Sequence, residues 1–296
     1  MTSSVTTREG TFADRLEAAR GSRRKTVDRV ARSIALAATI ACVVPLAAVL
    51  VYIVLKGTQS LNLDLITRPS KALGAGGGAL QAWLGTLQMV ALAALFAVPI
   101  GILAGIFVSE FAGHRAARSV RFASDVMAGI PSILIGVFVY ALLVLPFKQF
   151  NAFAGSVALA IIMVPMIQRT TEEVLRLVPR ELREGSLALG VPTWRTTLSI
   201  VLPTARAGIL TAVMLAVARA AGETAPLLFT ALGSRLVNVG SLTQPMDSLT
   251  LFIYNGARSP ISAVIDQAWG AALLLLLLVL GINILVRVRS MGGTHA

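Results

Sequence analysis

Arg219 and Glu223 are two charged residues inside a long apolar stretch. A charge in the hydrocarbon of a bilayer costs roughly 2.5–3.5 kcal/mol on insertion scales, so both side chains must face protein or a water-filled path. Their spacing of four places them on one face of a helix. An arginine fork can bind a tetrahedral oxyanion at two points, and a carboxylate can accept a hydrogen bond from a P–OH group, which sulfate lacks. We therefore predict an oxyanion site here; an ion pair that only fixes the helix is the alternative.

A second informative stretch runs from Thr171 to Pro203, the longest polar interruption between apolar spans in the second half of the chain. Pro179 and Pro192 suit the first turns of helices, and Gly190 suits a helix end. The pattern predicts two short helices at an angle, held outside the bilayer. Such an element is suited to being gripped by a partner protein.

Several other chemistries are excluded. The glycine-rich run 74–78 lacks the G-x4-G-K-[ST] pattern of a phosphate-binding loop, which occurs nowhere in the chain. Cys42 is the only cysteine, and the two histidines, His114 and His295, form no cluster, so no metal site is predicted. No nucleophile–base pattern is visible. We expect no enzyme activity, ATP hydrolysis included, and no cofactor bound by this chain.

The elements that position these residues are membrane spans. The chain is 56% hydrophobic and 14% charged, whereas a soluble domain carries about 25% charged residues, so a polytopic all-α membrane protein is predicted. We expect six transmembrane helices, at Ser33–Leu55, Trp83–Val108, Phe122–Leu145, Ala152–Gln168, Ala205–Leu232 and Trp269–Val286. Prolines in or near these spans, at positions 99, 131, 165 and 226, are expected to be packed kinks.

The charges between the spans predict the orientation. The net charge of +12 does not indicate nucleic-acid binding, because the basic residues flank apolar spans and form no stripe with aromatic residues. They are concentrated in the arm 1–31, in alternate connections and near the tail 291–296. The transmembrane domain is therefore 32–290, with both termini and the loop 171–203 in the cytoplasm.

Two further expectations concern residues beside the spans. Glu110 and Asp125 flank spans on the cytoplasmic side and are predicted to be cap or surface charges. The longest outer connection, Gly233–Gln267, contains a predicted short helix over Leu249–Asn255. That helix either serves as a docking surface for an extracytoplasmic binding protein or lies in the interface without a partner.

Two motifs resemble a known family. The loop resembles the EAA loop of bacterial ABC importer permeases, E-A-A-x3-G-x9-I-x-L-P, with small residues in place of both alanines. The corresponding positions are Glu184, Gly185, Ser186, Gly190, Ile200, Leu202 and Pro203. The run Arg219–Leu227 resembles the R-A-x-G-E-T-A-P signature of permeases of the phosphate-specific ABC importer, PstA type, and Gly129–Ile133 is similar to another segment of that family.

The resemblance implies the type I ABC importer permease fold and ATP-driven phosphate import by alternating access. It implies that the EAA positions couple to the ATPase and that Thr224 belongs to the translocation site with Arg219 and Glu223. The implied partners are a homologous second permease, two ATP-binding subunits, an extracytoplasmic phosphate-binding protein and the lipid of a bacterial plasma membrane. Two alternatives stay open: a permease for another oxyanion, such as sulfate or molybdate, and an ion-coupled secondary transporter.

Overall fold

A computed structural model describes residues 12–71 and 76–292, and every regular element in that part of the chain is a helix. The chain divides into two compact units, Met1–Val54 and Leu55–Ala296. The described part of the first unit belongs to helix α1 (Phe12–Ser60), and its stretch Val27–Ser60 is long and apolar enough to cross a membrane. This confirms the first predicted span. Part of the predicted arm 1–31, part of the glycine-rich run 74–78 and most of the predicted tail 291–296 lie outside the described residues.

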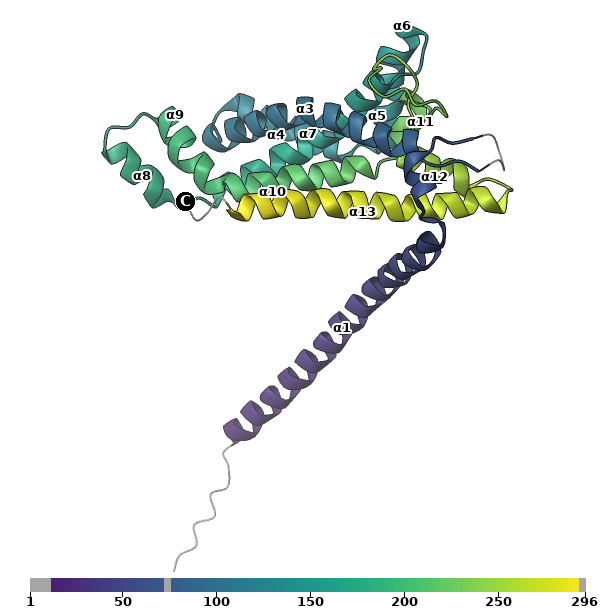
Figure 1. Cartoon of the computed structure of the whole chain (residues 1–296). Helices are drawn as coiled ribbons and strands as arrows, with labels where there is room; N and C mark the ends of the chain where they lie inside the picture. The colour runs from purple at the N-terminus through teal and green to yellow at the C-terminus, as the bar shows by residue number, and fades with distance from the viewer. Residues whose placement is uncertain (1–11, 72–75, 293–296) are drawn as a thin grey trace, which may run out of the picture. The chain divides into compact units, whose positions relative to one another are not determined.

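The second unit holds the other helices (Figure 1). They are α2 (Leu63–Thr67), α3 (Leu80–Glu110), α4 (Arg115–Gly129), α5 (Ser132–Val139), the π-helical turn η1 (Tyr140–Val144), α6 (Leu145–Phe147), α7 (Ala152–Arg176), α8 (Arg180–Ala188), α9 (Thr193–Thr196), the π-helical turn η2 (Thr197–Val201), α10 (Leu202–Ala221), α11 (Ala225–Thr230), α12 (Leu249–Ala257) and α13 (Ser262–Gly292). With α1, five described stretches can each cross a membrane, and the bent pair from α4 to α6 makes a sixth. The prediction of six spans agrees with this count when the bent pair is one span.

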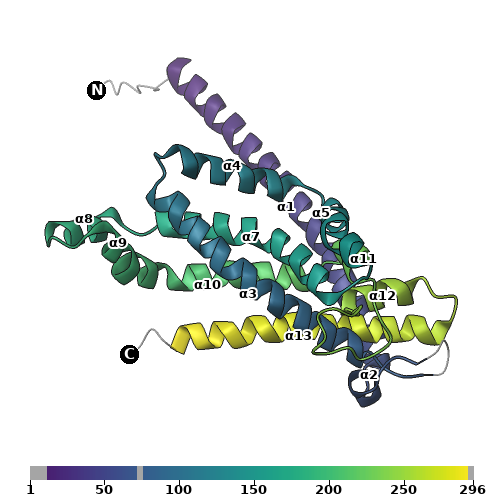
Figure 2. The same cartoon turned by 90° about the horizontal axis from the view of Figure 1, so that it is seen from above.

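Helix α7 forms the core of the second unit. In its most apolar window 67% of the residues are buried, against 28% for α3 and for the α9–α10 span and 22% for α13. It packs against α3, α4, α5, α10 and α11, and Figure 2 shows it between α4 and α10. The first turns of α7 are rich in buried small residues, which let neighbouring backbones approach closely in a membrane.

Helix α3 meets α7 through a row of small residues. Ala93, Ala97, Gly101 and Gly105 recur every four positions and are all buried. A Cβ atom on Gly101 would lie 2.7 Å from the Cβ of Ile167, and one on Gly105 would lie 2.7 Å from the Cβ of Thr171. This small-xxx-small row therefore determines how closely the two helices pack.

The third predicted span, Phe122–Leu145, is not one helix. It breaks between α4 and α5, which differ in direction by 102°. Ile130 at the break has an extended backbone (φ −73°, ψ 130°), as expected for a residue before proline, and Pro131 has no N–H to continue the helix. The expectation that Pro131 makes a packed kink was wrong. By contrast, Pro99 and Pro165 lie inside continuous helices.

The fifth predicted span, Ala205–Leu232, was also wrong in its bounds. The helix begins at Thr193, continues through η2 and ends at Ala221, where Gly222 caps it. Pro226 lies in the first turn of the separate helix α11 and does not kink a span. Arg219 is therefore in the last turn of its helix, and Glu223 lies beyond the helix end.

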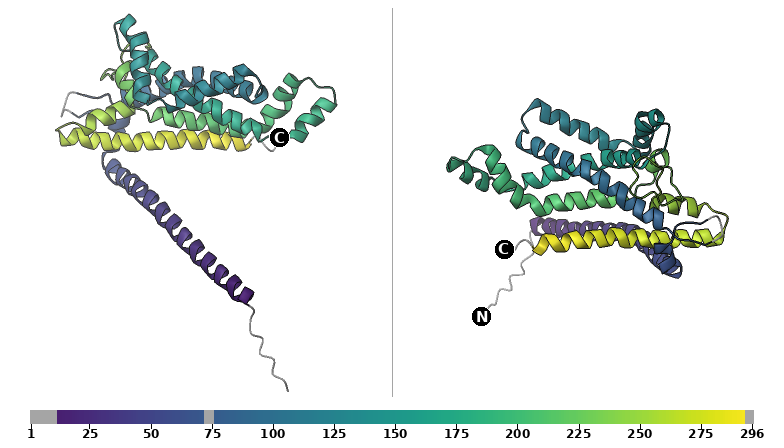
Figure 3. Two further views of the ribbon diagram at one scale, coloured as in Figure 1. Left: turned by 180° about the vertical axis from the view of Figure 1, so that it is seen from behind. Right: turned by 45° about the horizontal axis from the view of Figure 1, so that its top comes forward.

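The second unit has two opposite ends. Helices α8 and α9 lie at one end, and α11 and α12 lie at the other (Figures 1, 2 and 3). The predicted helix Leu249–Asn255 is confirmed as α12, capped by the side chain of Ser248. Its first three residues are buried rather than lying on the surface.

Candidate functional site

Arg219 lines a cavity of about 290 Å³ beside the break in the third span. The last turn of α10 supplies the arginine, the ends of α4 and α5 supply Ile130 and Ser132, and α7 supplies Arg169 and Thr170. The Arg219 side chain is 59% exposed, so its guanidinium is accessible. A cation in the last turn of a helix is favoured by the helix dipole. The cavity combines two guanidinium groups and two hydroxyl groups with one carboxylate, that of Glu173. The guanidinium groups can bind an oxyanion.

Glu223 stays next to Arg219 although the helix ends between them. Its Oε1 lies 3.5 Å from the Nε of Arg219, and its side chain is 16% exposed. Its backbone carbonyl accepts a hydrogen bond from the Thr250 hydroxyl of α12, at 2.9 Å. Thr224 precedes α11, and its carbonyl accepts from the N–H groups of Leu227 and Leu228. Neither Glu223 nor Thr224 is among the residues that line the cavity, so Arg219 alone of the three predicted residues faces it.

Arg169 is a cavity residue that sequence reasoning missed. Its guanidinium lies 3.4 Å from Glu173 and 3.6 Å from Asp125, both of which are well exposed. Asp125 is thus a surface charge, as predicted. The position of Arg169 at the end of an apolar span only weakly indicated a functional role. The fold is what places it in the same cavity as Arg219. Both partners of Arg169 are solvated, so these ion pairs are weak and leave it able to bind an anion.

The predicted coupling loop is shorter than the range Thr171–Pro203. Residues 171–176 belong to α7, and residues 193–203 belong to the long fifth helix. Of the two predicted short helices, only α8 is separate, with Pro179 at its N-terminus. Gly190 has φ +78°, a left-handed conformation that favours glycine, and it follows the end of α8 as predicted.

The EAA positions fall into three groups. Glu184 and Gly185 are exposed on α8. Ser186 is buried, and its hydroxyl lies 2.9 Å from that of Thr196, which joins α8 to α9. The remaining positions, Ile200, Leu202 and Pro203, lie at the junction of η2 and α10. Pro203 has no N–H to donate, and the helix widens to a π turn just before it.

Large apolar side chains surround α8 on the surface. Leu189 is 84% exposed and Trp194 is 65% exposed, with Leu182 and Leu187 of α8 also exposed. Exposed apolar groups gathered beside charged residues mark protein interaction surfaces. The end of the molecule that carries α8 and α9 is therefore suited to a partner, as the loop pattern predicted.

Glu110 is not the surface charge that was predicted. It ends α3, its side chain is 19% exposed, and its Oε1 accepts a hydrogen bond from Arg183 of α8 at 2.7 Å. Its Oε2 accepts from the hydroxyl of Thr197 at 3.2 Å. A single carboxylate thus joins three elements. This contact could not be predicted from sequence spacing, because Glu110 and Arg183 are 73 positions apart.

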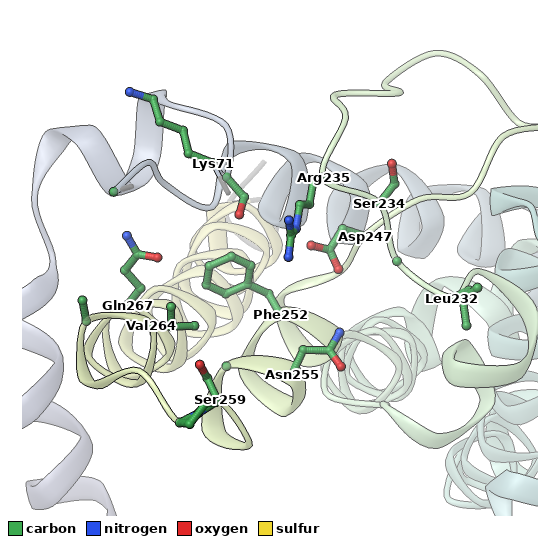
Figure 4. Close-up of a pocket in the computed structure, with 16 residues that line it drawn as sticks. Lys71, Leu232, Ser234, Arg235, Asp247, Phe252, Asn255, Ser259, Val264 and Gln267 are labelled. Atoms are coloured by element: carbon green, nitrogen blue, oxygen red, sulfur yellow. The ribbon is translucent and has the colours of Figure 1, made fainter. Parts of the chain in front are cut away.

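A second cavity, of about 400 Å³, lies at the other end of the second unit (Figure 4). Figure 4 shows the side chains of Arg235 and Asp247 directed toward the same space, near the ring of Phe252, whereas the ammonium of Lys71 points away. Burial raises the pKa of Asp247 to about 7, although a hydrogen bond from the Ser248 N–H and the nearby Gln81 amide favour its charged form. This buried carboxylate was also missed from the sequence.

The described side chains form no metal-binding cluster. Among residues 27–71 and 76–284, no three side chains of histidine, cysteine, aspartate or glutamate come together in a way that could hold a metal ion. Each cavity is lined by arginine and by a carboxylate: Arg169, Arg219 and Glu173 line the first, and Arg235 and Asp247 line the second.

Comparison with known sequences gives a consistent result. Residues 97–289 match the family described as binding-protein-dependent transport system inner membrane component. The chain is 42% identical over 241 residues to the phosphate transport system permease protein PstA of Pasteurella multocida, covering 81% of this chain and 86% of the relative. It is 43% identical over 210 residues to the protein of the same name from Mycobacterium leprae, covering 70% and 69%.

Solved structures share the fold. A chain of the MetNI methionine ABC transporter, in an inward-facing conformation, superposes with a TM-score of 0.60 at 20% identity, covering 71% of this chain and 94% of that one. A chain of a bacterial ABC transporter for alginate import superposes with a TM-score of 0.56 at 16% identity, covering 91% and 99%. The fold is that of type I ABC importer permeases, as predicted.

Proposed function

This chain belongs to the family of binding-protein-dependent transport system inner membrane components, and from this premise we propose that it is the permease subunit of an ATP-driven ABC importer for inorganic phosphate. The substrate class follows from relatives at 42–43% identity that are named phosphate transport permeases. The observation that carries the proposal is the cavity at the broken third span, where Arg219 and Arg169 offer two anion-binding groups. The protein is a multi-pass membrane protein.

Arg219 is proposed to bind phosphate directly. A guanidinium fork matches two oxygens of a tetrahedral oxyanion, and Arg169 can hold a third from α7. The hydroxyl groups of Ser132 and Thr170 line the same cavity. The exposed positions of both arginines suit a path shared with a second permease.

Glu223 is proposed to select the protonated oxyanion. Its carboxylate lies 3.5 Å from Arg219, so an anion bound by that arginine comes near it. Phosphate near pH 7 carries a P–OH group that can donate to the carboxylate, whereas sulfate has none and meets only repulsion. Thr224, at the start of α11, keeps its predicted place in the translocation path as part of this proposal.

Energy is proposed to come from two ATP-binding subunits, one of which docks on α8, because the chain itself has no phosphate-binding loop. The other proposed partners are a homologous second permease and an extracytoplasmic phosphate-binding protein. Both termini and α8 would be cytoplasmic in a bacterial plasma membrane, according to the positive-inside rule. The exposed apolar residues around α8 support docking at that end.

Import would proceed by alternating access. ATP binding closes the partner subunits and moves α8, and the movement reaches the spans around Arg219. The cavity then opens to the other side of the membrane. Such a change shifts the equilibrium only by the difference in the partners' affinity for the two conformations.

The test is uptake of labelled phosphate, with sulfate as competitor, in cells that lack this chain and are complemented with variants. Arg219→Lys should reduce uptake by about tenfold or more at normal membrane levels, because lysine cannot make the two-point contact. The matched control is Arg68→Lys, which alters an exposed i,i+4 ion pair outside the cavity and should leave uptake unchanged. Glu223→Gln should let sulfate compete.

Each contrary outcome has a definite meaning. If uptake persists in Arg219→Lys, Arg219 does not bind the anion, and its role is a structural ion pair with Glu223. If the wild type restores no phosphate uptake, the substrate is another one, and sulfate and molybdate are the next to test. Uptake driven by an ion gradient without ATP would instead indicate a secondary transporter.

A further inference from the structure

Glu110 and Arg183 form a connection between α8 and the membrane spans. Arg183 Nη1 donates to Glu110 Oε1 at 2.7 Å, and Arg183 Nη2 donates to the backbone carbonyl of Leu175 at 3.0 Å. The second oxygen of Glu110 accepts from the Thr197 hydroxyl at 3.2 Å. The two charged side chains are only 19% and 24% exposed. This arrangement is called the α8 clamp below, after its residues Glu110, Arg183, Leu175 and Thr197.

The clamp reaches three spans at once. Leu175 is near the end of α7, Thr197 is in η2 at the start of the fifth span, and Glu110 is the last residue of α3. Helices α7 and α10 flank α8 in the chain and are joined to it covalently. Helix α3 has no such covalent link: it packs along α7, and Glu110 adds a direct hydrogen-bonded contact with α8.

The geometry of the clamp makes it stiff. The arginine fork is occupied by two acceptors from different helices, and both carboxylate oxygens have donors. Charge-assisted hydrogen bonds with defined directions are stronger and more specific than a solvated ion pair. The exposed pair Asp64–Arg68, whose side chains are 53% and 57% exposed, offers a contrast within the same chain.

We propose that Glu110 and Arg183 are positioning residues that transmit the movement of α8 to α3, α7 and α10 together, so that ATP hydrolysis and import stay coupled. The proposal rests on the proposed function, because it assumes that ATP-hydrolysing subunits dock on α8. Without the clamp, α3 follows α8 only through its packing against α7, and the movement is transmitted less completely. ATP is then hydrolysed without a full change of access.

The experiment uses the complete transporter reconstituted in lipid vesicles, with ATP hydrolysis and labelled phosphate uptake measured on the same preparation. Glu110→Gln and Arg183→Met should lower the phosphate imported per ATP by about fivefold or more, the lower range of typical coupling between sites. ATP hydrolysis should persist. Asp64→Asn, which removes the carboxylate of the exposed pair, should leave the ratio unchanged.

A covalent cross-link in place of the Glu110–Arg183 contact distinguishes transmission of movement from a role in stability alone. In a Cys42→Ser background, Glu110→Cys and Arg183→Cys are combined, and a short bismaleimide then joins the two thiols. Before cross-linking, the ratio of import to hydrolysis should be low. After cross-linking it should rise toward that of the Cys42→Ser protein, since the bond restores the link between α3 and α8. A milder variant, Thr197→Val, should cause a smaller loss of coupling in an intact complex.

The outcomes are distinguishable. If ATP hydrolysis and import fall in parallel in all variants and cross-linking restores neither, the clamp is only structural and the proposal is overturned. An unchanged ratio in Glu110→Gln also overturns it, while phosphate import by the wild type upholds the proposed function. Absence of phosphate import by the wild-type complex would overturn the proposed function itself.

Discussion

Charged side chains in this protein differ in how well their surroundings stabilise the charge. Arg219 is accessible, lies in the last turn of its helix and has a carboxylate beside it, so its charge is satisfied and still available. Asp247 is the opposite case, a buried carboxylate with a backbone N–H and an amide side chain as its neighbours. Arg235 lines the same cavity. For a single buried carboxylate, the cost of burial appears as a raised pKa.

Asp247 should make stability depend on pH. Burial raises its pKa from 3.8 to about 7, so the folded state binds the proton more tightly than the unfolded state. Its stabilising contribution is complete below pH 3.8 and is lost as the pH rises through about 7. Asp247→Asn, which retains an oxygen to accept the Ser248 N–H, should flatten this dependence between about pH 4 and pH 7.

The measurement is thermal melting of the purified protein in detergent across that pH range. The melting temperature of the wild type should be several degrees lower at about pH 7 than at about pH 4. The melting temperature of the asparagine variant should change less over this range. The control is Asp64→Asn, at an exposed position, which should follow the wild type. Identical pH profiles for Asp247→Asn and the wild type would contradict a raised pKa.

At the scale of elements, helix packing and helix breaks decide the architecture. The small-residue row of α3 allows close contact with α7, and the Ile130–Pro131 break lets one span turn by 102° beside the cavity. The π turn η2 accommodates Pro203 at the junction between the α8–α9 region and the fifth span. These local features determine where Arg219, Arg169 and Ser132 can meet.

The α3–α7 contact predicts a clear effect of one methyl group. Gly105→Ala places a Cβ 2.7 Å from that of Thr171 and 2.9 Å from the carbonyl oxygen of Gln168, so backbone must move. Overpacking of this kind costs about 1–3 kcal/mol. Gly113→Ala is the matched control, because its added Cβ would meet nothing within 4 Å. Melting temperature and the folded fraction after detergent extraction should fall for the first variant only; equal values would argue against close helix contact.

At the scale of the whole molecule, the proposed function requires the two ends of the second unit to face different compartments. The end with α8 carries the proposed docking surface for ATPases, and the opposite end carries α12 and the cavity of Asp247. The positive-inside rule assigns the first end to the cytoplasm. Sidedness is therefore a property that one labelling experiment can check.

Cysteine labelling from either side of the membrane should separate the two ends. In a Cys42→Ser background, Val239→Cys should react with a membrane-impermeant maleimide applied to spheroplasts. Leu177→Cys should react only in inverted vesicles. Both positions are well exposed, at 47% and 79%, so access within the protein does not limit the reaction. The reverse labelling pattern would overturn the orientation and, with it, docking of cytoplasmic ATPases on α8.

The sequence alone determined several features of this protein. Long apolar runs predicted six spans because a bilayer accepts a backbone only when its hydrogen bonds are satisfied within helices. Pro179 and Gly190 predicted the limits of α8, and fixed spacings predicted the family. Each of these features depends on local backbone chemistry or on transfer from water, and neighbours in the chain carry both signals.

Only the tertiary structure decided which distant residues meet. Glu110 and Arg183 are 73 positions apart, and Arg169 and Arg219 share a cavity although they belong to different spans. The sequence showed Pro131 but could not distinguish a kink from a break, because the helices packed around it determine how far the chain turns. The burial of Asp247 likewise depends on side chains from other elements. A linear pattern records what each residue prefers, whereas its partners are decided by how the helices pack.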